Sequence, residues 1–557
     1  MSQDNNESII IIGGSNAGVS AATRIRRLNE KANITIIEQS SFIGSNQAAL
    51  PYFISGAVTS VETIIADIEP TLQNVYDIDL LKNCQVTRID RKNHKLYIYN
   101  HVNMQDFEME YDKLVVATGF EYDVTEDSTI SSMNNFFTLK SLEDVIKIRH
   151  FIDTSAVRDI AIIGSNCISV KTAAALIEQC FNVTLIDKKP VLLEEFDDDF
   201  NSILKKEITK ADCTLYLNTD VRKYTKNADN YITLVQADGL ELKVDMVLYF
   251  DNIRPNTRLA QSCGCNVGSN NGLCVNADFR TNDDSIWAGG SAVELPDFIT
   301  KDMTTKFSVS QSSFHGRQIG SNICGTNTTE SHNVMNYFFK LKSFAVGIAG
   351  INESQAKKSG YDYIIAEVFT GDHERFIPNA HQIHLKLIVD RKSRRILGGQ
   401  VSGSSDSVER KMDIILSAIY GGMTVDMLTN MNFSYNPQMN LVADPVNTVA
   451  MIAQNIIDGI SNPVYSKNLT LSDNICLLDI RTKNEHDRSR VINSLWIPLD
   501  ELRDRLKEIP KDKKIYVYGH VGIRSYIAES ILKGSGFKHV YNIVGGISSI
   551  KINENID

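Results

Sequence analysis

The chain has 557 residues, of which 43% are hydrophobic and 22% are charged, so it is long enough for three or four globular domains and is neither disordered nor fibrous. Its formal net charge of −11 argues against nucleic acid or an anionic membrane as the main partner, because either would require a basic face. The longest apolar run near the start, Ile9–Ile12, is too short for a signal peptide or a membrane span. The composition therefore predicts a cytoplasmic protein.

The first predicted elements form a βαβ unit. A strand at Ser8–Ile12 leads into a glycine-rich loop at Gly13–Gly18 and a helix at Val19–Leu28. A second strand at Asn33–Ile37 ends in Glu38. Glycines let the backbone approach a pyrophosphate, the helix N-terminus offers free N–H groups, and the carboxylate accepts a ribose hydroxyl. The unit predicts a dinucleotide site with the candidate residues Gly13, Ser15, Asn16, Ala17, Gly18 and Glu38.

A second unit of the same kind is predicted about 150 residues later, and its phosphate loop is altered. Only the first glycine, Gly164, is present, whereas Asn166 and Ser169 occupy the second and third glycine positions. Asp187 ends the second strand and suits a ribose 2′-hydroxyl, which favours NAD over NADP if a dinucleotide binds. The predicted elements are a strand at Ile160–Ile163, a helix at Val170–Gln179 and a strand at Val183–Ile186.

The cysteines do not indicate a disulfide framework or a metal site. The nine cysteines are sparse and irregularly spaced, which is typical of reduced thiols in a reducing compartment. Cys263 and Cys265 are the closest pair, but one intervening residue is not the C-x-x-C redox spacing and no second pair completes a zinc site. We expect two ordinary thiols in a surface loop.

The two dinucleotide units, with Leu114–Gly119 between them, resemble the pyridine nucleotide-disulfide oxidoreductases. These flavoproteins have an FAD domain, an inserted NAD domain and a C-terminal dimerisation domain. The resemblance implies FAD at the first unit, with Ala117, Thr118, Gly119 and Ser291 added to its site, and NADH at the second unit. Four segments resemble the coenzyme A-disulfide reductase branch, namely Ala49–Tyr52, Ile253–Thr257, Trp287–Val293 and Ala443–Asn447.

The last part of the chain, Leu469–Ile550, is similar to a rhodanese domain. The segments that carry this similarity are Leu477–Arg481, Ile497–Leu502 and Phe537–Gly546. Reductases fused to a rhodanese in this order are coenzyme A-disulfide reductases or NADH-dependent persulfide reductases. The whole chain resembles that fusion.

The expected fold is α/β throughout, with two doubly wound dinucleotide-binding domains, an α+β dimerisation domain and a C-terminal rhodanese-like α/β domain. The resemblance also implies a homodimer. The expected domains are FAD-binding at 1–150 and 255–330, NAD-binding-like at 151–254, dimerisation at 331–462 and rhodanese-like at 468–557.

Two loops that resemble cysteine active sites contain no cysteine. In the loop Asn46–Tyr52, Ala48 occupies the position of the reductase cysteine, and in the loop Tyr518–Ser525, Gly519 occupies that of the rhodanese cysteine. A methyl group or a hydrogen atom forms neither a thiolate nor a mixed disulfide. The resemblance therefore implies that disulfide reduction and sulfur transfer are absent, and it assigns no catalytic residue.

Three further positions bear on binding. Ser291 stands where the family has an aspartate that holds the ribityl chain of the flavin, so the hydrogen-bonding group remains without its charge. Arg24 matches a position that contacts coenzyme A in the family, and Arg524 remains in the rhodanese-like loop. A solvated helix face is the alternative interpretation for Arg24.

Three functional hypotheses stay open at this point. In the first, the chain is a flavoprotein that passes electrons from NADH to a small acceptor without a protein thiol. Alternatively, it is a non-catalytic sensor or partner protein that binds flavin, a coenzyme A-like molecule or a small sulfur ligand. The third hypothesis is a vestigial chain with little activity.

Overall fold

The computed structural model describes residues 7–44, 47–65, 68–124, 130, 133–326, 333–469 and 472–552. Asn46, the first residue of the reductase-like loop, lies outside these residues. The chain divides into two compact units, Met1–Pro190 with Ala211–Asn333, and Val191–Lys210 with Val334–Asp557. Within the described ranges, no helix is both long and apolar enough to cross a membrane.

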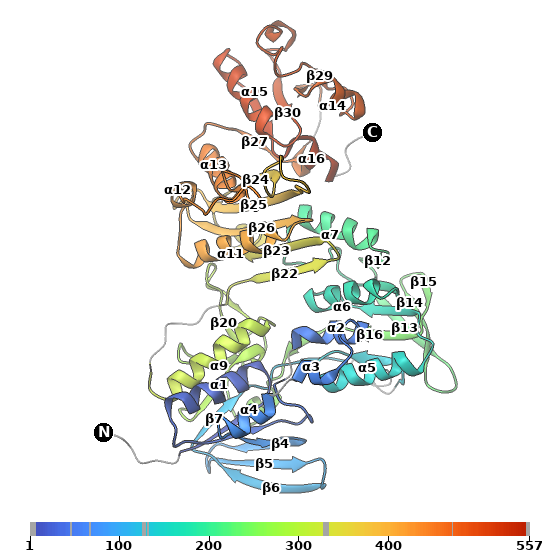
Figure 1. The fold of residues 1–557 in the computed structure, drawn as a ribbon, viewed down its shortest axis with the longest axis vertical. Coiled ribbons are helices and arrows are strands. Elements are labelled where there is room, and N and C mark those ends of the chain that lie inside the picture. Colours follow the sequence, from blue (N-terminus) through green and yellow to red (C-terminus); the bar gives the residue numbers. More distant parts are fainter. Residues whose placement is uncertain are drawn as a thin grey trace. The chain divides into compact units, whose positions relative to one another are not determined.

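The first unit contains a parallel five-stranded sheet that carries the first βαβ unit (Figure 1). Ile9–Ile12 is buried throughout, as expected for a strand in a parallel sheet that is covered on both faces. Helix α1 (Asn16–Leu28) packs against α9 (Val309–Ile323). In sheet order, the strands are β19 (Ile286–Ala288), β7 (Lys113–Val116), β1 (Ser8–Ile12), β2 (Asn33–Ile37) and β3 (Asp79–Leu81).

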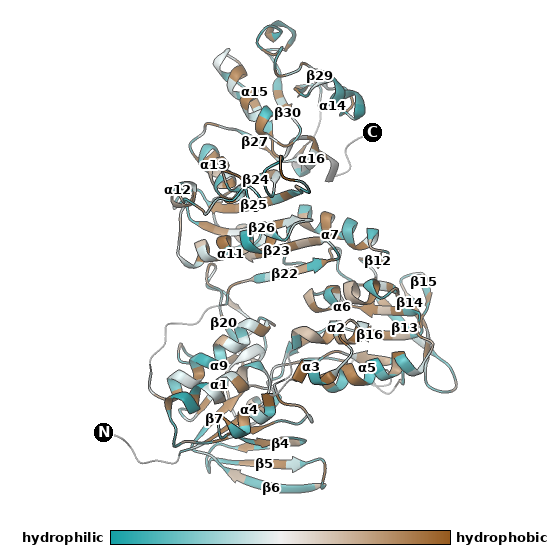
Figure 2. Cartoon of the chain, viewed as in Figure 1, coloured by the Kyte–Doolittle hydropathy of each residue, from teal (hydrophilic) through white to brown (hydrophobic). Residues whose placement is uncertain are grey.

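A second parallel sheet in the first unit carries the second βαβ unit. Helices α5 (Leu142–Thr154) and α6 (Cys167–Glu178) belong to this region, and α2 (Leu50–Ser55) packs against both. Figure 2 shows hydrophobic and hydrophilic residues alternating around α5, which buries Leu142 and Val145 on one side. In sheet order, the strands are β12 (Thr214–Tyr216), β11 (Asn182–Ile186), β10 (Asp159–Ile163), β16 (Met246–Tyr249) and β9 (Phe136–Thr138).

Smaller elements complete the first unit. The antiparallel three-stranded sheets are β4 (Cys84–Asp90), β5 (Lys95–Asn100) and β6 (Gln105–Glu110), and β13 (Val221–Lys226), β14 (Ile232–Ala237) and β15 (Leu240–Lys243). The short strands are β8 (Phe120–Tyr122), β17 (Ile253–Pro255), β18 (Leu273–Cys274), β20 (Val293–Pro296) and β21 (Met303–Thr304). The short helices are α3 (Val61–Ile65), α4 (Ile68–Asn74) and α8 (Arg258–Ser262).

The second unit begins with an antiparallel five-stranded sheet. In sheet order, its strands are β22 (Asn336–Leu341), β23 (Phe344–Gly350), β26 (Ile396–Gly403), β25 (Gln382–Asp390) and β24 (Tyr363–Gly371). The accompanying helices are α7 (Asp198–Lys210), α10 (Glu353–Lys358), α11 (Ser407–Tyr420), α12 (Val425–Thr429) and α13 (Pro445–Ile457). On β25 the ammonium of Lys386 is buried and pairs with Asp197, Asp199 and Glu353, which satisfies a charge inside the unit.

A parallel sheet with its own hydrophobic core forms the end of the second unit. In sheet order, its strands are β27 (Pro463–Val464), β31 (Val540–Ile543), β30 (Lys514–Tyr518), β28 (Ile475–Asp479) and β29 (Leu495–Trp496). The helices are α14 (Lys483–Arg488), α15 (Ile523–Gly534) and α16 (Gly546–Ile552).

The predicted strands Ser8–Ile12 and Asn33–Ile37 coincide with β1 and β2. The predicted helices begin too late, because α1 starts at Asn16 and α6 starts at Cys167. The last residues of each glycine-type loop already form the first helical turn. This places the helix N-terminus within the loop, where a phosphate would approach.

Candidate functional site

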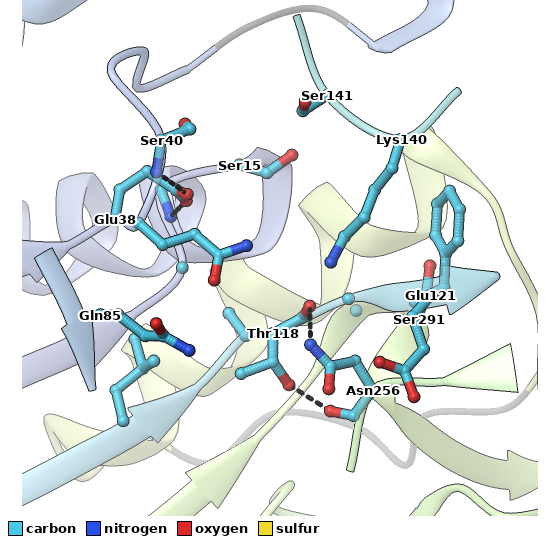
Figure 3. A pocket seen from close by; sticks show the side chains of 18 of the residues that line it. Ser15, Glu38, Ser40, Gln85, Thr118, Glu121, Lys140, Ser141, Asn256 and Ser291 are labelled. Carbon is cyan, nitrogen blue, oxygen red and sulfur yellow. Dashed lines mark hydrogen bonds between the residues drawn. The ribbon is translucent and has the colours of Figure 1, made fainter. Parts of the chain in front are cut away.

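A cavity of about 840 Å³ lies in the first unit at the carboxyl ends of the parallel strands (Figure 3). Its lining includes the loop after β1, the end of β2 and the turn after β7. Ligands of open α/β sheets bind outside the carboxyl ends of their strands. The predicted residues of the first nucleotide site that line it are Gly13, Ser15, Asn16, Ala17, Glu38, Ala117, Thr118, Gly119 and Ser291.

The N-terminus of α1 faces this cavity without a side-chain cap. Ser15 is the N-cap residue, and within the described chain its side chain makes no capping hydrogen bond. The close approach of helix and strand requires glycine, because a Cβ atom on Gly18 would lie 1.9 Å from the carbonyl oxygen of Gly13. The helix therefore presents uncapped N–H groups and its positive dipole end, which suit a pyrophosphate.

The Glu38 carboxylate is held in place at the end of β2. It accepts hydrogen bonds from the backbone N–H of Gly14 at 2.8 Å and of Ser40 at 2.9 Å (Figure 3). Both bonds fix the carboxylate at the cavity wall, where it suits a ribose hydroxyl.

On another side of the cavity, the turn after β7 is tied to the segment after β17. Thr118 Oγ1 donates to the carbonyl oxygen of Asn256 at 2.6 Å, and the Asn256 N–H donates to the Gly119 carbonyl at 2.9 Å. Ser291 is 8% exposed and contributes a neutral hydroxyl to the wall. At position 291 this wall therefore offers a hydrogen-bonding group that carries no charge.

Lys140 is a cavity residue that our sequence analysis missed. Its side chain extends into the cavity in Figure 3, and Glu121 also lines the wall. Burial lowers the pKa of the Lys140 ammonium, while the charges of Glu38 and Glu121 act in the opposite direction. One signal was present in the sequence: Lys140 directly precedes Ser141, the N-cap of α5, and so follows the end of a parallel strand.

The second nucleotide unit differs from the first at the start of its helix, because side chains cap the N-terminus of α6. Asn166 Oδ1 accepts the N–H groups of Ile168 at 2.9 Å and Ser169 at 3.0 Å. Ser169 Oγ in turn accepts the N–H of Asn166 at 2.8 Å, which completes a capping box. The groups that would meet a pyrophosphate are engaged within the chain.

The acidic end of the second unit is also engaged. Asp187 is 4% exposed and accepts hydrogen bonds from the Ser165 hydroxyl at 2.6 Å and from the Lys189 N–H at 2.7 Å. The Ser165 N–H also donates to this carboxylate. A separate cavity of about 320 Å³ adjoins Gly164 and Asp187. The structure thus places Gly164 and Asp187 at one cavity. Our sequence analysis had not foreseen that the Asp187 carboxylate is hydrogen-bonded to groups of the chain itself.

The reductase-like loop has no thiol. Ala48 is exposed in a single 3-10 turn, Gln47–Ala49, that leads into α2. Among the described residues that line the large cavity, Cys84 is the single cysteine. Burial raises the pKa of the Cys84 thiol, so this thiol is a poor replacement for a reactive thiolate.

The rhodanese-like loop connects β30 to α15. Gly522, at φ +108°, precedes α15, and within the described residues its helix N-terminus has no side-chain cap. A Cβ atom on Gly519 would lie 3.3 Å from both Arg524 Cβ and Ile480 Cδ1, so the position accepts a small side chain with a slight adjustment. This loop, which we call the cradle, ends at an uncapped helix N-terminus that suits an anion, and it contains no cysteine.

The two arginines that we considered for substrate binding have internal partners. Arg524 donates to both carboxylate oxygens of Glu485, at 2.7 and 2.6 Å. This bidentate pair lowers the pKa of Glu485 to about 2. Arg24 donates from Nε to Ser321 Oγ at 2.8 Å. Binding of a ligand phosphate by either arginine stays a prediction.

Cys263 and Cys265 lie with their Sγ atoms 3.8 Å apart. Cys265 is buried, so our expectation of two surface thiols was wrong for this residue. Its side chain belongs to the hydrophobic core of the first unit.

Residues 7–308 match the family described as pyridine nucleotide-disulphide oxidoreductase. Residues 338–444 match the dimerisation domain of that family, and residues 464–553 match the rhodanese-like domain. These matches confirm the predicted fold class.

The match to individual relatives covers most or all of the chain. The structure of reduced CoADR-RHD from Bacillus anthracis is 28% identical, with a TM-score of 0.95 and coverage of 100% of both chains. The structure of an NAD-dependent persulfide reductase from A. fulgidus is 31% identical, with a TM-score of 0.90 and coverage of 97% of this chain and 99% of that one. The NAD(P)H coenzyme A polysulfide/persulfide reductase of Pyrococcus horikoshii is 26% identical over 455 residues, which cover 81% of this chain and 99% of the relative.

Proposed function

We propose that this chain, which belongs to the pyridine nucleotide-disulphide oxidoreductase family, is an FAD-binding protein of the coenzyme A-disulfide and persulfide reductase type. In this proposal it does not carry out the cysteine-based chemistry of that type. One contrast carries this proposal. The first nucleotide site keeps its uncapped helix and its oriented carboxylate, whereas Ala48 and Gly519 stand in the two loops where nucleophiles are expected.

The residues present fit FAD. The N-terminus of α1 would hold the pyrophosphate, Glu38 the adenosine ribose, and Ser291 a hydroxyl of the ribityl chain. Lys140 places a cationic group at the cavity wall, where an anionic group of the cofactor would offset its burial. FAD bound there would supply two-electron redox chemistry, and the residues named above would orient it.

Thiol-disulfide exchange requires a thiolate that attacks sulfur. Ala48 has no such group, and the buried Cys84 is unsuited to replace it. Sulfur transfer requires a thiolate at the head of the cradle before α15, where Gly519 has only a hydrogen atom. Both half-reactions are therefore lost in this proposal, and a homodimeric, cytoplasmic flavoprotein remains.

A second candidate is a non-catalytic protein that binds flavin or a coenzyme A-like ligand as a sensor or as a partner of an active relative. The capped N-terminus of α6 favours it, because a flavoprotein without an electron donor has no turnover. A small sulfur ligand is a further possible occupant of the cradle before α15.

The test uses the full chain as purified, with its flavin content measured by visible absorption. We expect bound flavin and no NADH-dependent reduction of coenzyme A disulfide or a persulfide above background. The Ala48→Cys variant is then assayed with photochemically reduced flavin in place of NADH, with Ala48→Ser as the matched control. We expect reduction of coenzyme A disulfide by the cysteine variant alone. Enzymatic turnover by the unaltered chain, or absence of flavin after incubation with FAD, would refute the proposal.

A further inference from the structure

We propose that Asn166 and Ser169 close the pyrophosphate site of the second nucleotide unit, so that the chain does not bind NADH or NADPH there. The family implies a nicotinamide dinucleotide at this unit. The side chains at the N-terminus of α6 and beside Asp187 oppose the binding of such a dinucleotide. This inference concerns the electron donor of the proposed function. It rests on that function only for the identification of the second unit as a nicotinamide site.

The two nucleotide units of the chain provide an internal comparison. In each, the residue after the first glycine donates its N–H to the carboxylate that follows the second strand, from Gly14 to Glu38 and from Ser165 to Asp187. The units therefore share the same loop geometry up to this point. They differ at the next residue, where Ser15 leaves α1 without a side-chain cap within the described chain and Asn166 caps α6.

The cap occupies the atoms that would bind a pyrophosphate. Anions bind at helix N-termini through N–H groups that lack intrahelical partners. In α6, Asn166 Oδ1 accepts two of these N–H groups, and Ser169 Oγ accepts that of Asn166 itself. A pyrophosphate would have to replace all three hydrogen bonds.

The Asn166 carboxamide is also held from its other end. Its Nδ2 group donates to the carbonyl oxygen of Phe250 at 2.9 Å. Rotation of the side chain out of the site would therefore break a fourth hydrogen bond. Ser169 is fully buried at the position where the family motif has a glycine, so its hydroxymethyl group cannot swing into solvent without moving α6.

The ribose end gives a second, independent obstacle. Asp187 is 4% exposed, and the Ser165 hydroxyl donates to it at 2.6 Å. Gly14 stands at the corresponding position of the first unit and has no hydroxyl. Among the described residues, Glu38 accepts its hydrogen bonds from backbone N–H groups, whereas a ribose at the second unit would have to compete with a side-chain donor for Asp187.

The experiment is a calorimetric titration of NADH, and separately NADPH, into the purified full chain, with the flavin content of the same sample recorded by absorption. We expect a Kd weaker than about 0.5 mM for both, near the weak end of the range for enzyme substrates. The double variant Asn166→Gly with Ser169→Gly should bind NADH at least about tenfold more tightly, because it restores free helix N–H groups.

Asn352→Gly is the matched control, because Asn352 caps α10 with the same type of capping box, formed with Gln355. It should leave NADH binding unchanged. The single variant Ser169→Gly serves if the double variant does not fold, and it too should bind NADH more tightly than the unaltered chain. A Kd tighter than about 0.5 mM for the unaltered chain would overturn the inference.

Equal binding by the unaltered chain and the folded variants would overturn the assignment to Asn166 and Ser169. The flavin reading separates this inference from the proposed function. A sample without flavin that cannot be refilled contradicts the proposed function, whereas the NADH titration reports on the second unit in either case.

Discussion

Arg524 and Glu485 form a bidentate ion pair, with nitrogen to oxygen distances of 2.7 and 2.6 Å, beside the loop position that Gly519 occupies. Glu485 also accepts hydrogen bonds from Thr482, so the pair links α14 to the start of α15. The cradle is thus stabilised by contacts that do not depend on a cysteine.

Gly519→Cys should restore a reactive thiol to this cradle. The backbone at 519 needs no left-handed conformation, and the new Cβ would meet its nearest neighbours at 3.3 Å. The N-terminus of α15 lowers the pKa of a nearby thiol and favours the thiolate. We expect sulfur transfer from thiosulfate to cyanide at least about tenfold above the unaltered chain. Gly519→Ser is the control, and equal rates for both variants would show that the cradle is not competent.

The Arg524–Glu485 pair should make the stability of the terminal domain depend on pH. Because the pKa of Glu485 is lowered to about 2 in the folded state, its stabilisation is complete above the unfolded pKa, near 4.5, and is lost as the pH falls toward 2. We expect a loss of about 1 kcal/mol over this window, after allowance for solvent screening. Urea unfolding followed by tryptophan fluorescence in a Trp287→Phe background, which leaves Trp496 as the reporter, measures it.

The matched variant for this pH dependence is Arg524→Met, which removes the charge beside Glu485 and retains apolar volume. The decline between pH 4.5 and 2 should be smaller in this variant, because the pKa of Glu485 returns toward its ordinary value of 4.5. Other carboxylates such as Asp479 also titrate at low pH, so the difference between the two proteins is the informative quantity. Identical slopes would contradict this role of the pair.

Glu38→Gln should weaken FAD binding by about tenfold or more, because hydrogen bonds to a charged group contribute about 1.5 to 3 kcal/mol. The amide nitrogen would also face one of the two N–H groups that the carboxylate now accepts, from Gly14 or Ser40. Flavin fluorescence during reconstitution of the flavin-free protein gives the affinity. Asp187→Asn, the equivalent change in the second unit, should leave FAD affinity unaltered, and a similar loss in both would argue against the assignment.

Gly18→Ala should prevent stable FAD binding and destabilise the first unit by about 1 to 3 kcal/mol, as overpacking does. The added Cβ would lie 1.9 Å from the Gly13 carbonyl oxygen, so α1 would have to move away from β1. Thermal unfolding and flavin retention measure the effect. Gly534→Ala is the control, because its Cβ would have no neighbour within 4 Å among the described residues. Normal flavin retention in Gly18→Ala would show that the close approach is not required.

Sequence patterns predicted the parts of the fold that local periodicity determines. The strands Ser8–Ile12 and Asn33–Ile37 agree with the structure, because apolar runs bounded by polar residues are a strong strand signal. The helix starts were wrong by three residues, since the loop residues that precede the apolar stretch form the first turn. The site residues after β1, β2 and β7 lie around one cavity, as the strand ends of a parallel sheet imply.

Features that depend on three-dimensional partners could not be read in the same way. The sequence showed that Asn166 and Ser169 replace two glycines of the motif. The reciprocal hydrogen bonds between these residues depend on side-chain rotamers, which the sequence does not show. The pairing of Arg524 with Glu485 joins residues 39 positions apart. Lys140 lies far in sequence from Glu38, and its place before the N-cap of α5 indicates a strand end without indicating which cavity it enters.

Anaerobic reduction of the purified protein with dithionite tests the central claim most directly. Bound FAD accepts about two electrons, and an additional redox-active cysteine site accepts about two more. We predict a bound flavin whose absorption is lost after about two electrons per FAD. Uptake of about four electrons per FAD, or a protein that cannot be loaded with FAD, would contradict the account of a flavoprotein that has lost its thiol chemistry.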